Sequence, residues 1–227
     1  MKYENIKEGK FISRPNRFIA IIEIDGREEV CHVKNTGRCK ELLVPGCRVF
    51  VQEFENTNRK TKFDLIAVYK GDILINMDSQ APNKVFAEWI RKGNFFKNVT
   101  FLKAEKKFHE SRFDFYIEAD GKKIFAEIKG VTLEENKIAL FPDAPTERGV
   151  KHIKELCRSI EEGYEAYIFF VIQFKGTEYF KPNKKTHPEF ADALEVAYEK
   201  GVHIVVVDCD CGEDFLVVSD FVRSELK

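Results

Sequence analysis

The stretch from residue 111 to residue 129 reads SRFDFYIEADGKKIFAEIK, and it decides which kind of domain the second half of the chain forms. Apolar and polar side chains alternate on both sides of Asp120-Gly121, which is the pattern of two antiparallel strands joined by a two-residue turn. With this turn, Phe115 lies opposite Ala126. One face of the hairpin is then apolar and consists of Phe113, Phe115, Ile117, Ile124, Ala126 and Ile128.

The other face brings two carboxylates together. Asp114 faces Glu127 and Arg112 faces Lys129, with opposed Cβ atoms roughly 4.5–5.5 Å apart. Two facing acids destabilise a sheet unless a cation lies between them, and oxygen ligands of this kind favour Mg²⁺ or Mn²⁺. The carbonyl of Ile128 is a candidate third ligand, and Lys129 is suited to stabilising a phosphate or orienting a water. The alternative is a solvated polar face on which each acid points into water or pairs with Lys or Arg.

An acid followed by Glu-x-Lys on a hairpin resembles the pattern of the restriction-endonuclease-like, or PD-(D/E)XK, nuclease superfamily. The sequence that flanks this motif identifies a family more specifically. It is similar to the sugar fermentation stimulation protein (SfsA) family over nearly the whole chain. The similar segments are HVKNTGR (32–38), ELLVPG (41–46), NRKT (58–61), SRFDF (111–115), EIKGVTL (127–133) and FPDAPTERGVKH (141–152). Lys34 and Phe63 depart from the family pattern.

This resemblance implies both a fold and a role. The fold is of the α/β (α+β) class: an OB-like five-stranded β-barrel in residues 1–80, followed by a nuclease-like α/β domain with a mixed central sheet in residues 81–227. The role is DNA binding and regulation of sugar-utilisation genes, those for maltose among them, with a retained divalent-metal site. The alternative is a Mg²⁺- or Mn²⁺-dependent nuclease that hydrolyses DNA or RNA, because the Asp114, Glu127 and Lys129 set is intact.

Five short strands in the first third suit a small barrel, and they are expected at residues 18–24, 30–34, 48–54, 63–69 and 73–76. OB-type barrels bind single strands through a curved face with basic and aromatic groups. The candidate nucleic-acid-binding residues here are His32, Asn35, Thr36, Gly37, Arg38, Arg59, Lys60 and Thr61. The alternative is that Asn35 to Gly37 only makes a turn and caps a short helix that starts near Arg38.

The charge of the whole chain gives no general attraction to nucleic acid, because the formal net charge is −1. Attraction must therefore be local. Residues 31–62 supply it, since seven basic side chains there stand against three acidic ones. A basic stretch of this kind can follow a phosphate backbone.

Residues 78–83 form the expected junction, where Asn83 caps a helix that runs to about Lys92. Glu88 lies inside this helix. In nuclease-like folds an acid of the first helix often joins the metal ligands, so Glu88 is the candidate third carboxylate, catalytic and metal-binding. The alternative is an acid that faces solvent beside Trp89.

After the hairpin we expect a strand at 136–141 and a helix from Asp143 or Thr146 to about Glu162. Arg148, Lys151 and His152 fall on its first turns, where the free N–H groups and the helix dipole favour phosphate. These three residues and Arg112 of the hairpin are further candidate nucleic-acid-binding residues. His152 is interpreted as structural or phosphate-contacting. A strand (166–174), a helix (188–199) and a second buried strand (202–208) follow, which fits a parallel crossover. Gln173 ends its apolar run, so it reaches the cleft or makes a strand-end hydrogen bond.

Composition limits the class of protein. A chain of 227 residues with 44% hydrophobic content is globular. Its six cysteines lack zinc-site spacing, so free thiols in a reducing compartment are expected. No segment has transmembrane length, and we expect a cytoplasmic protein with no membrane partner. DNA, with single strands or RNA as alternatives, is the expected partner, and a homodimer stays open.

Overall fold

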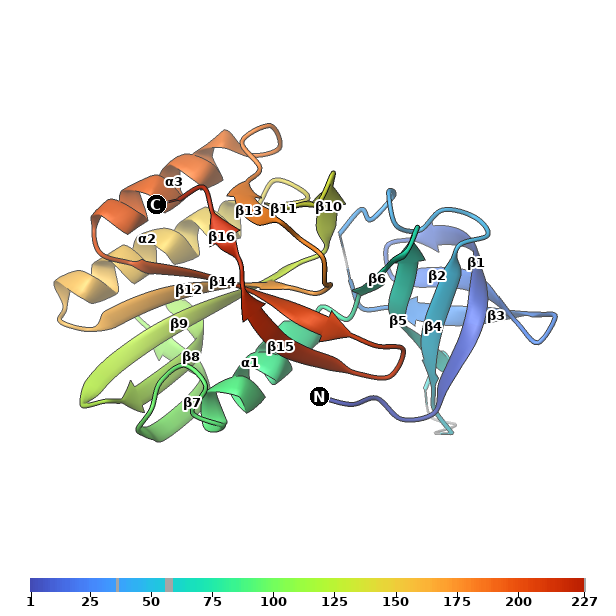
Figure 1. Cartoon of the computed structure of the whole chain (residues 1–227), viewed down its shortest axis with the longest axis horizontal. Helices are drawn as coiled ribbons and strands as arrows, with labels where there is room; N and C mark the ends of the chain where they lie inside the picture. The colour runs from blue at the N-terminus through green and yellow to red at the C-terminus, as the bar shows by residue number, and fades with distance from the viewer. Residues whose placement is uncertain (36, 56–58, 227) are drawn as a thin grey trace.

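The computed structural model describes residues 1–35, 37–55 and 59–226. A β-barrel lies at one end of the molecule, and a large sheet flanked by helices lies at the other (Figure 1). The fold class expected from the sequence is confirmed: an N-terminal OB barrel precedes a mixed α/β domain.

Strand β1 lies between β2 and β4 in the barrel, and the sequence analysis did not predict it. The first sheet has the order β3-β2-β1-β4-β5-β6. An additional pairing of β3 with β5 closes the five strands β1, β2, β3, β4 and β5 into a ring. The strands of this sheet are β1 (Ile6–Asn16), β2 (Ile19–Ile24), β3 (Arg27–Val33), β4 (Arg48–Glu53), β5 (Phe63–Lys70) and β6 (Ile73–Asn76). The sequence analysis placed β6 in the barrel. In the structure β6 lies outside the closed ring and pairs antiparallel with β5. β1 escaped notice because it contains Gly9 and Pro15, residues that weaken a strand pattern.

The large sheet of the second domain has the order β15-β14-β12-β9-β8-β7. β9, β12 and β14 are parallel in its centre, and antiparallel strands flank them. Its strands are β7 (Val99–Phe108), β8 (Ser111–Ala119), β9 (Lys122–Val131), β12 (Glu165–Ile172), β14 (His203–Cys211) and β15 (Leu216–Phe221). A smaller sheet contains β10 (Leu133–Glu135), β11 (Ile138–Phe141), β13 (Tyr179–Pro182) and β16 (Arg223–Ser224).

Three helices cover the large sheet. α1 (Ala81–Arg91) lies on one face, and α2 (Glu147–Glu161) and α3 (Pro188–Glu199) lie on the other (Figure 1). α2 begins as expected, because the hydroxyl of its N-cap Thr146 accepts a hydrogen bond from the backbone N–H of Gly149 at 3.0 Å. Asn83 does not cap α1, which starts two residues earlier, with Pro82 in its first turn. Within the described part of residues 35–47 the chain makes turns, so the short helix expected near Arg38 is not formed.

The predicted apolar face of the hairpin packs against α1, with one exception. The members in this cluster are Phe115, Ile117, Ile124, Ala126 and Ile128. Phe113 instead joins the cluster on the side of α2, where its ring centroid lies 5.0 Å from that of Phe125. The alternation of β8 therefore breaks between Phe113 and Phe115. Across residues 1–35, 37–55 and 59–226, no helix has the length and apolar character needed to span a bilayer.

Candidate functional site

Strands β8 and β9 separate at the position of Asp114. Their pairing follows the expected register from Ala119↔Lys122 to Phe115↔Ala126 and then stops, while β8 goes on pairing with β7. The prediction that Asp114 faces Glu127 as a cross-strand pair is therefore wrong. Instead the Asp114 carboxylate accepts a hydrogen bond from the backbone N–H of Ile128 at 2.8 Å. It takes the place of the strand carbonyl that the ladder no longer supplies.

Asp114 is held in a setting that disfavours its charged form. Burial raises its pKa, and the negative charge of Glu127 raises it further. The N–H of Ile128 and the side-chain amide of Asn83, which donates at 3.0 Å, only partly offset this. Asn83 was expected to cap α1, and it is the α1 residue that reaches the site.

Glu127 is 2% exposed, and its two oxygens have different surroundings. Oε1 pairs with the ammonium of Lys129 at 2.7 Å and with Nδ1 of His152. Oε2 is buried and has no hydrogen-bond partner among the described residues. Burial would raise the pKa of Glu127, but the hydrogen bond from His152 and the charge of Lys129 outweigh it and hold the pKa below its ordinary value.

His152 links α2 to β9. Arg148 Nε donates to His152 Nε2 at 3.4 Å, so Nε2 is the acceptor and Nδ1 carries the proton that His152 donates to Glu127. His152 is 5% exposed. This supports its interpretation as a structural residue. The contact with Glu127 was missed because helix and strand meet only in the folded chain.

Three predicted site residues lie elsewhere. Glu88 pairs with the amino group of Met1 at 2.8 Å, so its assignment as third carboxylate is wrong: it lies five residues after Asn83 on α1, beside β15. Arg112 pairs with Glu105 at 3.2 Å. Lys151 donates to a backbone carbonyl at 3.4 Å. Among the residues that the structure describes, no three His, Cys, Asp or Glu side chains group as metal ligands.

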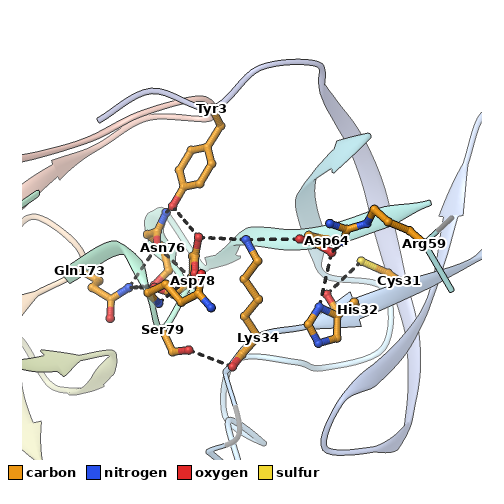
Figure 2. A network of polar contacts seen from close by, with 11 residues as sticks. Tyr3, Cys31, His32, Lys34, Arg59, Asp64, Asn76, Asp78, Ser79 and Gln173 are labelled. Carbon is orange, nitrogen blue, oxygen red and sulfur yellow. Dashed lines mark hydrogen bonds and ion pairs between the residues drawn. The ribbon is translucent and has the colours of Figure 1, made fainter. Parts of the chain in front are cut away.

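The parallel pairing of β3 and β5 gathers part of the predicted barrel face around Asp64 (Figure 2). This carboxylate is 1% exposed and contacts His32 Nδ1 at 3.4 Å, Lys34 Nζ at 3.3 Å and the guanidinium of Arg59. His32 and Arg59 are therefore engaged by a buried anion. Lys34 also pairs with buried Asp78 at 3.2 Å. Lys34 was not among the binding residues predicted from the sequence, where it stands out as a departure from the family pattern.

Two further residues of the predicted face, Gly37 and Arg38, line an open cavity of ≈ 410 Å³. Its lining is Arg14, Asn16, Arg17, Gly37, Arg38, Cys39, Lys40 and Leu43. Arg14 holds the loop by donating to the carbonyls of Asn35, Gly37 and Arg38 at 2.8–3.0 Å. Lys60 is exposed, and the Thr61 carbonyl accepts from Arg59 at 3.3 Å. Thr36 lies outside the described residues.

We expect Asp114→Asn to stabilise the protein without divalent cations by about 1 kcal/mol at pH 7. The pKa of Asp114 is higher in the folded protein than its ordinary value of 3.8. The protonated carboxyl therefore stabilises the fold below pH 3.8, and this stabilisation is lost as pH rises through the folded pKa. Urea unfolding in EDTA at pH 4 and pH 7 measures this. Asp120→Asn is the control: burial raises the pKa of Asp120, but the hydrogen bonds from Asn98 and Lys97 outweigh it and hold this pKa below its ordinary value, so removing the charge should not stabilise. Equal stability of Asp114→Asn and the parent at pH 7 would contradict the prediction.

Similarity to known proteins covers both domains. A family model described as the sugar fermentation stimulation protein RE domain matches residues 80–215, and one described as the SfsA N-terminal OB domain matches residues 12–77. A sugar fermentation stimulation protein homolog of Ruminiclostridium cellulolyticum is 62% identical over 226 residues, covering 100% of both chains. One of Clostridium beijerinckii is 63% identical over 222 residues, covering 98% of each.

A solved structure is similar over the same length. It is described as Pyrococcus furiosus SfsA in complex with Ca²⁺, and it matches with a TM-score of 0.90 and 29% identity, covering 99% of this chain and 98% of that chain. Two family models and relatives above 60% identity agree along the whole chain. The chain therefore belongs to the sugar fermentation stimulation protein family.

Proposed function

We propose that this protein binds nucleic acid and holds a divalent cation, Mg²⁺ or Mn²⁺, at Asp114 and Glu127. Because the family is named for stimulating sugar fermentation, we propose that binding DNA regulates sugar-utilisation genes, such as those for maltose. The observation that carries the cation site is the buried Oε2 of Glu127, which has no hydrogen-bond partner within residues 1–35, 37–55 and 59–226.

A buried carboxylate oxygen without a partner is costly and calls for an explanation. Hard divalent cations prefer such oxygens. A cation here would also lower the pKa of Asp114, which burial and Glu127 raise in its absence. The Pyrococcus furiosus relative described with Ca²⁺ supports the proposal, since Ca²⁺ takes the same type of ligand. The carbonyl of Ile128 stays our candidate for a third ligand.

The basic cavity of the barrel supports nucleic-acid binding. Arg17, Arg38 and Lys40 line it, and in the described part of the chain no carboxylate forms an ion pair with them. Unpaired cations of this kind are available to phosphates, and their contribution falls with rising salt. With a net charge of −1 for the chain, binding depends on this local group.

Phosphodiester hydrolysis is the second candidate, favoured by the pairing of Lys129 with Glu127 at 2.7 Å. A cation held by Asp114 and Glu127 would supply Lewis-acid charge to a phosphate oxygen and to water. In hydrolysis the water oxygen bonds to phosphorus, the bond to the leaving oxygen breaks, and the proton that the water releases is balanced by the proton that the leaving oxygen takes up. Lys129 stabilises the negative charge that develops on the phosphate, and His152 keeps Glu127 oriented.

The test measures binding and cleavage separately. Fluorescence anisotropy with labelled single- and double-stranded DNA and RNA, in Ca²⁺ or EDTA at low salt, should give tighter binding with the cation and a loss of affinity as salt rises. Denaturing gels with Mg²⁺ or Mn²⁺ test cleavage of the same molecules. Binding that is equal in EDTA would overturn the cation's role, and no binding to any of them at low salt would overturn the nucleic-acid function.

A further inference from the structure

A cavity of ≈ 120 Å³ lies where the two domains meet. Asn35 comes from the barrel, Ser79 from the connection, and the other lining residues come from the second domain. These are Gly130, Thr132, Leu133, Leu140, Phe141, Asp143 and Gln173. Gly130 directly follows Lys129 in β9, so the cavity adjoins the proposed cation site along the strand.

Gln173 presents a fixed hydrogen-bond acceptor to this cavity. The side chain is 2% exposed, and its NH₂ group donates to the carbonyl and side-chain oxygens of Asn76 and to the carbonyl of Asp78, at 3.0–3.1 Å. These bonds turn its amide oxygen away from Asn76 and Asp78 (Figure 2). The oxygen lies against Gly130, where a Cβ would be 2.5 Å away. No described residue donates a hydrogen bond to it.

Asp143 and Asn35 add two more polar groups. The Asp143 carboxylate lies against Gly37, where an added Cβ would be 2.3 Å from Oδ2 of Asp143, and it forms no hydrogen bond or ion pair with the described residues. Asn35 uses its side-chain oxygen to accept from the N–H of Gly37 at 2.8 Å, which leaves its NH₂ group free to donate. The rim thus offers two acceptors and one donor.

The other lining residues include an apolar side that is suited to one flat ring, beside Ser79, Gly130 and Thr132. Phe141, Leu133 and Leu140 form this side, and Phe141 is fixed by rings of Phe170 and Phe190 at centroid distances of 5.5 and 5.2 Å. An apolar cavity of about 150 Å³ holds a benzene molecule. The volume here therefore matches a single six-membered ring.

We propose that this cavity binds one unstacked nucleobase with an exocyclic amino group, for which single-ring cytosine is the best match. The inference rests on the proposed nucleic-acid binding, with the strand passing the Asp114–Glu127 site. The amino group donates to Gln173 and Asp143, and the base carbonyl accepts from Asn35. Thymine and uracil carry a carbonyl oxygen in place of the amino group, and two acceptors repel it.

The experiment compares a labelled dT oligonucleotide with the same oligonucleotide carrying one central dC, in Ca²⁺, by fluorescence anisotropy. We expect the dC strand to bind about tenfold tighter. Asp143→Ala should reduce this preference to under about threefold, because one acceptor is lost. Asp192→Ala, which removes the same charge from an exposed position on α3, should keep the full preference.

Each outcome separates the cavity from the wider function. Equal binding of both strands by the parent protein would overturn the nucleobase site while nucleic-acid binding stands. A preference for dC that survives in Asp143→Ala would also overturn it, since another part of the protein would then read the base. Absence of binding to either strand would overturn the proposed function and this inference together.

Discussion

Glu127→Gln is expected to raise the dissociation constant for Mn²⁺ by about 100-fold or more. The substitution keeps an oxygen for Lys129 and His152 but replaces the second carboxylate oxygen by an NH₂ group. In the parent protein that oxygen, Oε2, is buried without a partner among the described residues, and it is the atom offered to the cation. An NH₂ group in its place repels the cation and is left without an acceptor. Isothermal titration calorimetry with Mn²⁺ measures the effect.

Glu118→Gln on the same hairpin is the matched control. Glu118 accepts a hydrogen bond from the Tyr116 hydroxyl at 2.9 Å, which glutamine can also accept, so Mn²⁺ affinity should stay at the parent value. Circular dichroism establishes that both variants are folded. Mn²⁺ affinity of Glu127→Gln within about threefold of the parent would contradict the cation site. If the protein cleaves nucleic acid, Glu127→Gln should lose cleavage to the same extent.

Lys34→Met should lower the free energy of unfolding by about 3–5 kcal/mol. Lys34 lies between two carboxylates whose side chains are 2% and 0% exposed, at 3.3 Å from Asp64 and 3.2 Å from Asp78. Asp64 keeps Arg59 and His32, but Asp78 has no other ion-pair partner in the described part of the chain. Methionine therefore leaves Asp78 as a buried charge without an ion-pair partner among the described residues, and the N–H of Gln80, which donates to it at 2.9 Å, replaces only part of that stabilisation. Urea unfolding, followed by Trp89 fluorescence, measures the loss.

Two further variants separate charge from side-chain loss. Lys40→Met changes an exposed lysine of the same segment that forms no ion pair with described residues, and it should alter stability by less than about 0.5 kcal/mol. Lys34→Met combined with Asp78→Asn should recover most of the lost stability, because the charge is removed with its partner. A cost under about 1 kcal/mol for Lys34→Met alone would show that Asp78 does not depend on this ammonium.

The candidate site was predictable in its residues but not in its geometry. Asp114, Glu127 and Lys129 follow from the alternation around Asp120-Gly121, and the register held as far as Phe115. The separation of the strands at Asp114 could not be predicted, because it depends on two partners outside the hairpin: β8 stays paired with β7, and β9 stays paired with β12. Alternation rules describe a continuous ladder and fail where a ladder ends.

On the barrel face, the contacts of two predicted residues could not be predicted for a different reason. The sequence predicts that the basic and polar residues of this face are available to phosphate. In the structure His32 and Arg59 contact Asp64. Asp64 lies inside a strand that is predicted from its apolar pattern. A buried carboxylate in such a strand gives no periodic signal. Its partners are set by the pairing of β3 with β5, whose segments lie about thirty residues apart.

The sequence by itself determined the hairpin and two of the three helix positions, because periodicity, turn residues and caps act between near neighbours. The order of barrel before mixed sheet followed from the resemblance to the family. Tertiary structure decided that Asn83 and not Glu88 reaches Asp114, that His152 donates to Glu127, and that Asn35 and Gln173 border one cavity. Those contacts join segments far apart in the chain. The direction in which each side chain points there is set by packing between elements, which no local pattern records.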